Sequence, residues 1–252
     1  MNHRSDLGYA QARLQARHAA LPREEDWQRL AGARTLGSFL EEAREGALRS
    51  WVKGFSALSD AHDLDRGLRA IWREGVAEVA RWMPEPWRPA IAWLDWLALL
   101  PFLAHVGRYK SVPPWVGLDP DLHSLQGVDG ALDVMALRAS GGAALVVAPE
   151  GLAAAWRAHW HRLWPACGRA SRERLERLER LVLSHNLAFC QGGPEVAWSL
   201  RRELRERLRL EFHRLPLEPL TAFAFLALVA LDLERLRAAL MERALFDLRE
   251  AA

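Results

Sequence analysis

Residues 194–215 of this chain read PEVAWSLRRELRERLRLEFHRL, and this stretch decides the fold class. Apolar residues recur there every four positions, at Val196, Leu200, Leu204, Leu208 and Phe212. This period places them near one face of an α-helix, whereas a half-buried strand would alternate apolar and polar residues. The stretch therefore predicts a helix over 194–215. Its outer surface is expected to be basic, because six arginines and three glutamates lie between Arg201 and Arg214.

Helical patterns continue on both sides of this stretch. Residues 220–231 (LTAFAFLALVAL) form an apolar run of about three turns, which predicts a core helix that becomes amphipathic from Asp232 onward. Towards the N-terminus, helices are expected over 6–21 (capped by Ser5 or Asp6), from Pro22, from the cap Thr35, and over 60–83, 87–106, 149–164 and 169–187. Alternating runs of Val, Ile and Thr are nearly absent. We therefore expect an all-α protein.

The least regular part of the sequence is 111–148. It has the Pro, Gly and Asp density of a linker, and its segment SGGAALVV (140–147) fits either a short strand or a helix start. We place a domain boundary there. The apolar segment 87–106 includes Asp95, Pro101 and His105, and its apolar core is shorter than the roughly 20 residues that cross a bilayer. It is therefore expected to be a buried helix and not a transmembrane segment.

Composition excludes several classes of protein. With 252 residues, 50% of them hydrophobic and 26% charged, the chain can bury a sizeable core, which argues against disorder. Its net charge of +2 is too balanced to imply a nucleic-acid groove or a polybasic anchor. Cys167 and Cys190 make no disulfide framework, and the N-terminal residues contain no signal-like apolar stretch. These features favour a cytoplasmic location.

No catalytic or metal-binding pattern emerges from the sequence. His159 and His161 point about 200° apart on a helix, and adding Cys167 and His185 as zinc ligands would need a fold-back that the sequence does not specify. Neither GxxxxGK[ST] nor GxGxxG is present. The acidic clusters alternate with arginine, as in surface ion pairs. We therefore expect no catalytic residues, no bound metal and no cofactor. A metal hydrolase using these histidines and Cys167 is the enzyme alternative, and it predicts stoichiometric zinc.

Two segments at opposite ends of the chain resemble one family. Residues 8–45 contain Tyr9, Ala12, Arg13, Arg17, Leu21, Leu30, Phe39 and Leu40, and residues 218–246 contain Pro219, Leu220, Asp232, Leu236, Arg237 and Arg243. Both are similar to the AC39 family of V-type ATPase central-stalk proteins, and residues 78–113 resemble it more weakly. Leu97 and Arg235 stand where the family has an asparagine. The resemblance covers about two thirds of the chain and implies a shortened, divergent member.

The resemblance implies helical lobes, of which this chain has room for two. We expect two lobes of antiparallel helices, 1–118 and 149–252, with 119–148 as a linker or reduced middle segment. An internal pseudo-repeat supports this arrangement, because residues 93–110 align with 230–246 and place Asp95 on Asp232.

The resemblance also implies a mechanical role. It implies a non-catalytic central-stalk adaptor that couples the shaft of a rotary ATPase to its proteolipid ring, peripheral on the cytoplasmic face of the membrane, in H+ or Na+ transport. The residues expected to carry the family pattern or its interactions are Tyr9, Arg13, Arg17, Asp95, Asp232, Arg235 and Arg237. Arg13 and Arg17 are expected to pair with acidic groups between helices or on a partner. Asp232, together with Arg235 or Arg237, is expected to fasten the last helix to its neighbours. The alternative is a free-standing helical scaffold that docks an acidic protein or RNA through its arginine-rich helices.

Overall fold

The structure is a computed structural model, and it describes residues 3–214 and 216–246. These residues form helices and no strand; their only extended pairing is one isolated bridge between Gln126 and Leu132. The prediction of an all-α protein is confirmed. The α-helices are α1 (His3–Ala19), α2 (Glu24–Leu30), α3 (Leu36–Arg44), α4 (Arg49–Val52), α5 (Ala61–Trp82), α6 (Arg88–Ala92), α7 (Leu100–Tyr109), α8 (Val134–Ala139), α9 (Leu152–Arg162), α10 (Arg169–Gln191), α11 (Pro194–Arg214) and α12 (Leu220–Phe246). Six short 3-10 helices lie between them: η1 (Glu85–Trp87), η2 (Trp93–Leu99), η3 (Pro114–Leu118), η4 (His123–Leu125), η5 (Gly142–Leu145) and η6 (Pro149–Gly151).

The chain divides into two compact units at other places than the sequence predicts. The terminal unit combines Met1–Ile91 with Ala166–Ala252, and the central unit is Ala92–Pro165. The expected lobes 1–118 and 149–252 do not coincide with these units, because both ends of the chain pack into one of them. Residues 247–252 of the second expected lobe lie outside the described residues. The internal pseudo-repeat stays a prediction.

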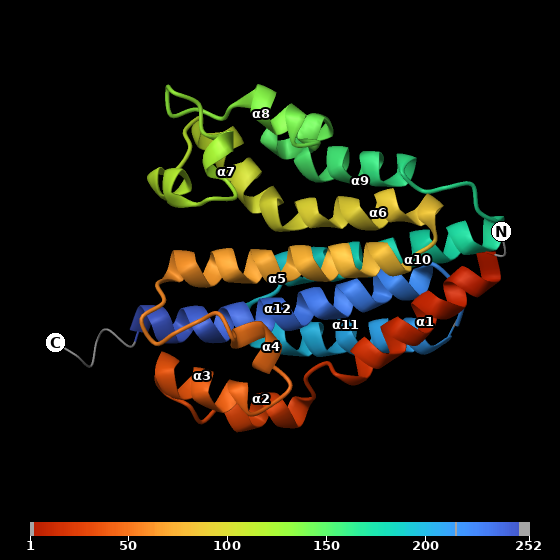
Figure 1. Cartoon of the computed structure of the whole chain (residues 1–252), viewed down its shortest axis with the longest axis horizontal. Helices are drawn as coiled ribbons and strands as arrows, with labels where there is room; N and C mark the ends of the chain where they lie inside the picture. Colours follow the sequence, from red (N-terminus) through yellow and green to blue (C-terminus); the bar gives the residue numbers. More distant parts are fainter. Residues whose placement is uncertain (1–2, 215, 247–252) are drawn as a thin grey trace. The chain divides into compact units, whose positions relative to one another are not determined.

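Helix α12 is the core of the terminal unit. Thirteen of its residues are buried: Leu220, Thr221, Ala222, Phe223, Ala224, Phe225, Leu226, Leu228, Val229, Asp232, Leu233, Leu236 and Leu240. A helix with buried residues on most of its surface must pack against other helices on several sides. Helices α5 and α11 run alongside it, and α1, α3 and α10 also contact it (Figure 1). The prediction that 220–231 is a core helix is confirmed, and its need for cover explains why both chain ends share a unit.

Helix α11 covers α12 with three of the five residues of its predicted apolar stripe. Leu204, Leu208 and Phe212 are buried, and the Phe212 ring lies 6.4 Å from the ring of Phe225 on α12. Val196 is exposed and Leu200 is half-buried. The helix therefore packs on α12 through its C-terminal half. The predicted last residue of this helix, Leu215, lies outside the described residues.

Side-chain caps fix the starts of two helices in the terminal unit. The hydroxyl oxygen of Thr35 accepts a hydrogen bond from the Ser38 backbone nitrogen at 3.2 Å, as predicted for α3. Asp60 accepts one from the Asp63 nitrogen at 2.8 Å, so α5 occupies nearly the whole predicted range. The predicted cap at Ser5 or Asp6 is wrong, because α1 begins at His3 and continues through both residues.

The central unit is built around tryptophan. The indole N–H of Trp93 donates to the carbonyl oxygen of Trp156 at 3.1 Å. On α9 the Trp156 and Trp160 rings stack at 5.6 Å, and Trp164 meets Trp160 edge-on at 4.9 Å. The irregular segment 111–148 forms η3, η4, α8 and η5 joined by turns, and Gly142–Leu145 within it is a 3-10 helix. The strand considered for 140–147 is therefore excluded.

The segment Glu85–Tyr109 is interrupted where one buried helix was expected over 87–106. It consists of η1, α6, η2 and α7, with 3-10 turns at Trp93–Leu99. By length and composition it is the one described segment that could cross a membrane, and 44% of its most apolar window is buried. Core helices of soluble proteins pass the same test, so this is weak grounds for a membrane span.

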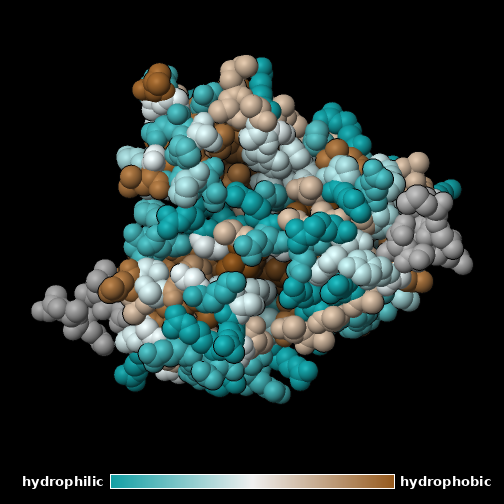
Figure 2. Space-filling view, in the orientation of Figure 1, coloured by the Kyte–Doolittle hydropathy of each residue, from teal (hydrophilic) through white to brown (hydrophobic). Residues whose placement is uncertain are grey.

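Hydrophilic side chains cover much of the face shown in Figure 2.

Candidate functional site

A cleft of about 710 Å³ in the terminal unit is the candidate site. It lies between α1, the turn that leads into α2, α11 and α12. This volume is within the range of ligand-binding pockets. The charged residues that line it are Arg23, Arg201, Arg202, Arg205, Arg209 and Arg235 with Glu24, Glu206 and Asp232. Positive side chains therefore outnumber negative ones by two to one.

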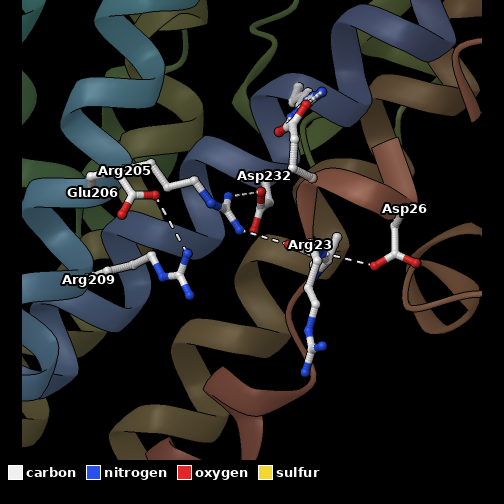
Figure 3. A network of polar contacts seen from close by, with 9 residues as sticks. Arg23, Asp26, Arg205, Glu206, Arg209 and Asp232 are labelled. Atoms are coloured by element: carbon white, nitrogen blue, oxygen red, sulfur yellow. Dashed lines mark hydrogen bonds and ion pairs between the residues drawn. The ribbon is translucent and has the colours of Figure 1, made fainter. Parts of the chain in front are cut away.

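Arg205 and Asp232 form the buried centre of the cleft. Asp232 of α12 is fully buried, and its Oδ1 accepts a hydrogen bond from Nη1 of Arg205 on α11 (Figure 3). The other terminal nitrogen of Arg205 donates to the carbonyl oxygen of Pro22 at 2.8 Å. Arg205 thereby joins α11 to α12 and to the turn before α2. Burial raises the pKa of Asp232 to about 6, and this outweighs the opposing effect of Arg205.

One oxygen of Asp232 lacks a hydrogen bond. Among the residues that the structure describes, none donates to Oδ2, which is buried. A buried carboxylate oxygen without a donor carries a desolvation cost. The cleft therefore contains an unused acceptor at its base, next to the Arg205 guanidinium.

Arg235 closes the rim of the cleft at α2. Its two terminal nitrogens donate to the two carboxylate oxygens of Glu24 at 2.7 and 2.9 Å. The same guanidinium lies 4.7 Å from the centre of the Trp27 ring and 5.3 Å from that of Trp198. The hydrogen bond from Arg235 is the main reason why the pKa of Glu24 is lowered. A two-pronged pair of this kind fixes the direction of both side chains.

Three arginines of the cleft have no carboxylate of their own. Arg209 pairs with Glu206 at 3.6 Å, whereas Arg23, Arg201 and Arg202 form no ion pair within the described part of the chain. Figure 3 shows Arg205 and Arg209 extending from α11 on the side where Arg23 lies. The cleft thus holds a surplus of guanidinium groups.

His18 lines the cleft beside its arginines. Its ring stacks on Phe212 at 4.3 Å. Burial lowers the pKa of His18 to about 4, with further lowering from His213, Arg209 and Arg205. Burial is the larger cause, and the charges of Arg205 and Arg209 disfavour the protonated imidazole further. The arrangement is suited to holding an anion.

The structure gives each predicted residue of α12 a partner on another helix. Asp232 pairs with Arg205 of α11, a partner that the sequence did not name. Arg235 binds Glu24, and Arg237 donates to Asp65 of α5 at 2.8 Å. These side chains point away from the axis of α12 in different directions, so each meets a different neighbour. All three still tie α12 to other helices, as the prediction required.

The remaining predicted residues lie outside the cleft. Arg17 pairs with Glu78 of α5 at 2.5 Å, which agrees with the expected inter-helix pairing. Arg13 instead donates to the Tyr9 hydroxyl at 3.2 Å, and both side chains are exposed. Asp95 is half-buried in η2 of the central unit. The sequence therefore predicts Asp232 and Arg235 of the cleft as interaction residues, and Arg205 only as one of the arginines through which the alternative would dock its partner. It does not single out His18 or Trp198. The feature of the sequence that could have pointed to this cleft is the arginine-rich surface predicted for residues 194–215.

The histidines of the proposed zinc set pack against aromatic rings. His159 lies 4.2 Å from Trp93, His161 lies 4.6 Å from Trp164, and His185 lies 5.9 Å from Phe189, as ring-centre distances. Cys190 is exposed and Cys167 is half-buried. No group of three metal-ligating side chains occurs in the described ranges.

Comparison with known proteins gives no further assignment. No protein-family model, curated protein or solved structure matches this chain. The class that the structure defines is an all-α protein with an arginine-lined cleft in its terminal unit.

Proposed function

We propose that this protein is a non-catalytic helical adaptor, related to the AC39 family of V-type ATPase proteins, that couples the central shaft to the proteolipid ring of a rotary ATPase. One observation supports this proposal above the others. The two segments that resemble the family, residues 8–45 and 218–246, lie at opposite ends of the chain but pack together in the terminal unit.

Specific contacts join these two segments. Arg235 holds Glu24 through two hydrogen bonds, and Arg243 donates to the carbonyl oxygen of Ala33 at 2.9 Å. The guanidinium of Arg243 also lies 4.6 Å from the centre of the Phe39 ring. The family-like residues Phe39, Asp232 and Arg243 thus belong to one packed body. A stiff body of this kind suits a protein that transmits force between partners.

A pull-down from native membranes tests the proposal. The tagged protein is recovered in mild detergent, and its companions are identified by mass spectrometry. We expect the ring and shaft proteins of a rotary ATPase, with weaker recovery for Arg13→Ala, because Arg13 is exposed and its side chain contacts Tyr9 of its own helix. Arg207→Ala is the control, since Arg207 is an exposed arginine of α11 paired with Glu203. Recovery of neither ring nor shaft proteins would contradict the proposal.

A second candidate is a free-standing binding protein that docks an acidic protein or RNA. The guanidinium groups of Arg23, Arg201 and Arg202, which form no ion pair with the described residues, favour it. Binding through these groups would weaken as the salt concentration rises. Salt-sensitive retention on RNA, lost when Arg201, Arg205 and Arg209 are substituted in protein that thermal unfolding shows to be folded, would support the RNA form. Elemental analysis of the same preparation tests the metal-hydrolase alternative.

A further inference from the structure

We infer that the arginine-lined cleft is a docking groove for an acidic peptide segment of a partner protein. The inference deepens the proposed adaptor function, on which it rests, by naming the chemistry of one partner contact. Four features of the cleft carry it: the charge surplus, the spacing of the arginines, an exposed tryptophan and the helix surfaces that form the walls.

The surplus of positive charge in the cleft would be balanced by a ligand with more than one negative group. Arg205 already forms an ion pair with Asp232, and Arg209 forms one with Glu206. Arg235 forms an ion pair with Glu24. Among the described residues, Arg23, Arg201 and Arg202 form no ion pair, although the Arg201 guanidinium lies 4.9 Å from the centre of the Phe189 ring and 5.6 Å from that of Trp198. Six positive side chains against three negative ones leave the cleft with a surplus of three positive charges. Guanidinium groups bind carboxylates with two parallel hydrogen bonds. A ligand with several carboxylates would complete the set.

The arginines are spread along a helix and not gathered at a point. Arg201, Arg205 and Arg209 follow one another at intervals of four residues on α11, with Arg202 beside the first. At 1.5 Å per residue, they extend over about 12 Å. A single phosphate group is too small to reach both ends of this row. A short peptide with acidic side chains at successive positions covers that length, since an extended chain advances about 3.3 Å per residue.

Trp198 contributes an exposed aromatic surface to the same cleft, where the guanidinium groups of Arg201 and Arg235 lie 5.6 and 5.3 Å from its ring centre. Its side chain is 55% exposed, although tryptophan is a residue that proteins generally cover. Leu228 and Leu231 of α12 line the same cleft. Tryptophan and arginine are the residues most enriched among those that dominate protein–protein binding. The ligand is therefore expected to carry an apolar residue among its acidic ones.

The walls that α11 and α12 form present arginine side chains to a ligand. α11 and α12 present the middle of each helix, where backbone N–H groups are bonded within the helix. Phosphate sites typically use the free N–H groups of a helix N-terminus. The one nearby N-terminus, that of α2, already holds Glu24, Glu25 and Asp26 in its first turn. Recognition in this cleft therefore depends on side chains alone.

Fluorescence anisotropy with the full-length protein tests the inference. The probe is a fluorescein-labelled peptide Glu-Glu-Leu-Glu-Glu, and its control is Gln-Gln-Leu-Gln-Gln. We expect saturable binding of the first peptide only, weakened roughly tenfold by Arg202→Gln. Arg207→Gln lies on the same helix outside the cleft, and it should change the affinity less than about twofold. Thermal unfolding of each variant checks that the fold is intact.

A second readout places the peptide in the cleft. Added negative charge near His18 favours its protonated form, so the NMR-detected pKa of His18 should rise when the acidic peptide saturates the protein. Trp198→Ala should weaken binding of the acidic peptide. This variant removes an exposed side chain, so the protein should still fold.

Several results would overturn the inference. One is that the acidic peptide does not bind, and another is that Arg202→Gln and Arg207→Gln lose the same amount of peptide affinity. A third is that the pKa of His18 does not change when the peptide is added. The last is that an oligouridylate RNA or inorganic phosphate binds more tightly than the peptide and depends equally on Arg202. Recovery of rotary ATPase proteins in the pull-down, together with any of these, would reject the docking groove and leave the adaptor proposal standing. Peptide binding without such recovery would reject the rotary role alone.

Discussion

Arg205 and Asp232 are 27 residues apart in the chain, and they form the ion pair that joins α11 to α12 at the base of the cleft. Asp232 is fully buried, and the side chain of Arg205 retains 22% exposure. A buried charge is tolerated only when it is paired or hydrogen-bonded, because transfer from water is costly. The terminal unit is therefore expected to depend on both partners.

Removing Arg205 should destabilise the protein strongly at neutral pH. Arg205→Ala leaves the Asp232 carboxylate buried without a cation and removes the hydrogen bond to Pro22. We expect a loss of about 3 kcal/mol in the free energy of unfolding, measured by urea denaturation at pH 7.5. At pH 5 the loss should be smaller, since Asp232 can then take up a proton. Arg207→Ala should cost less than about 1 kcal/mol, and a similar cost for both variants would contradict the prediction.

Asp232 should make the protein less stable as the pH rises from about 4 to 6. Its pKa is about 6 in the folded protein and 3.8 as the ordinary value, so the folded state binds more protons in this window. Relative to Asp232→Asn, the wild-type protein should lose stability on the order of 2 kcal/mol across the window. Urea unfolding of both proteins at several pH values measures the difference. A difference that does not change with pH would disprove the assignment.

His18 should contribute with the opposite sign. Its pKa is lowered from 6.5 to about 4 in the folded protein, so the unfolded chain binds more protons between these values. The contribution of His18 to stability is therefore complete above about pH 6.5 and is lost as the pH falls towards 4. Relative to His18→Gln, the wild-type protein should gain stability as the pH rises through this range. The same urea series tests this, and a gain of the reverse sign would refute it.

Two glycines of α5 should respond oppositely to alanine. A Cβ at Gly75 meets no atom within 4 Å, so Gly75→Ala gains only helix propensity and should stabilise the protein by roughly 0.5–1 kcal/mol. A Cβ at Gly67 would lie 2.2 Å from Cε1 of Phe55, which is buried. Gly67→Ala should therefore destabilise the protein despite the same gain in propensity. Thermal unfolding compares the pair, and a shift of equal sign in both would show that Phe55 is not held in place.

The cap of α3 should contribute measurably to stability. The Thr35 hydroxyl oxygen accepts from the Ser38 nitrogen, and the Ser38 hydroxyl in turn interacts with the Thr35 backbone nitrogen at 3.3 Å. Thr35→Ala should cost about 1 kcal/mol, and Thr35→Ser should cost much less because it keeps the oxygen. Denaturant midpoints of the two variants provide the measurement. Equal midpoints for Ala and Ser would exclude a capping role.

The sequence predicts the helices far better than the pairs between them. The range 60–83 becomes α5, Ala61–Trp82, because an apolar period of 3.6 residues and a capping side chain are both local properties of the chain. For the candidate cleft, Asp232 and Arg235 are predicted to fasten the last helix to its neighbours, but their partners Arg205 and Glu24 are not predicted. Arg205 is one of six arginines on a basic helix, and nothing in its neighbours along the chain distinguishes it from Arg207.

The sequence by itself therefore determined the fold class, the extent of most helices and the burial of residues 220–231, since backbone hydrogen bonding and apolar periodicity act over a few residues. Only the tertiary structure decided that residues 1–91 and 166–252 form one unit and that Arg205 meets both Asp232 and Pro22. The physical reason is that these contacts depend on how each helix is rotated against its neighbours. That rotation results from packing several apolar faces around α12 at once, and the pattern of any single helix does not contain it.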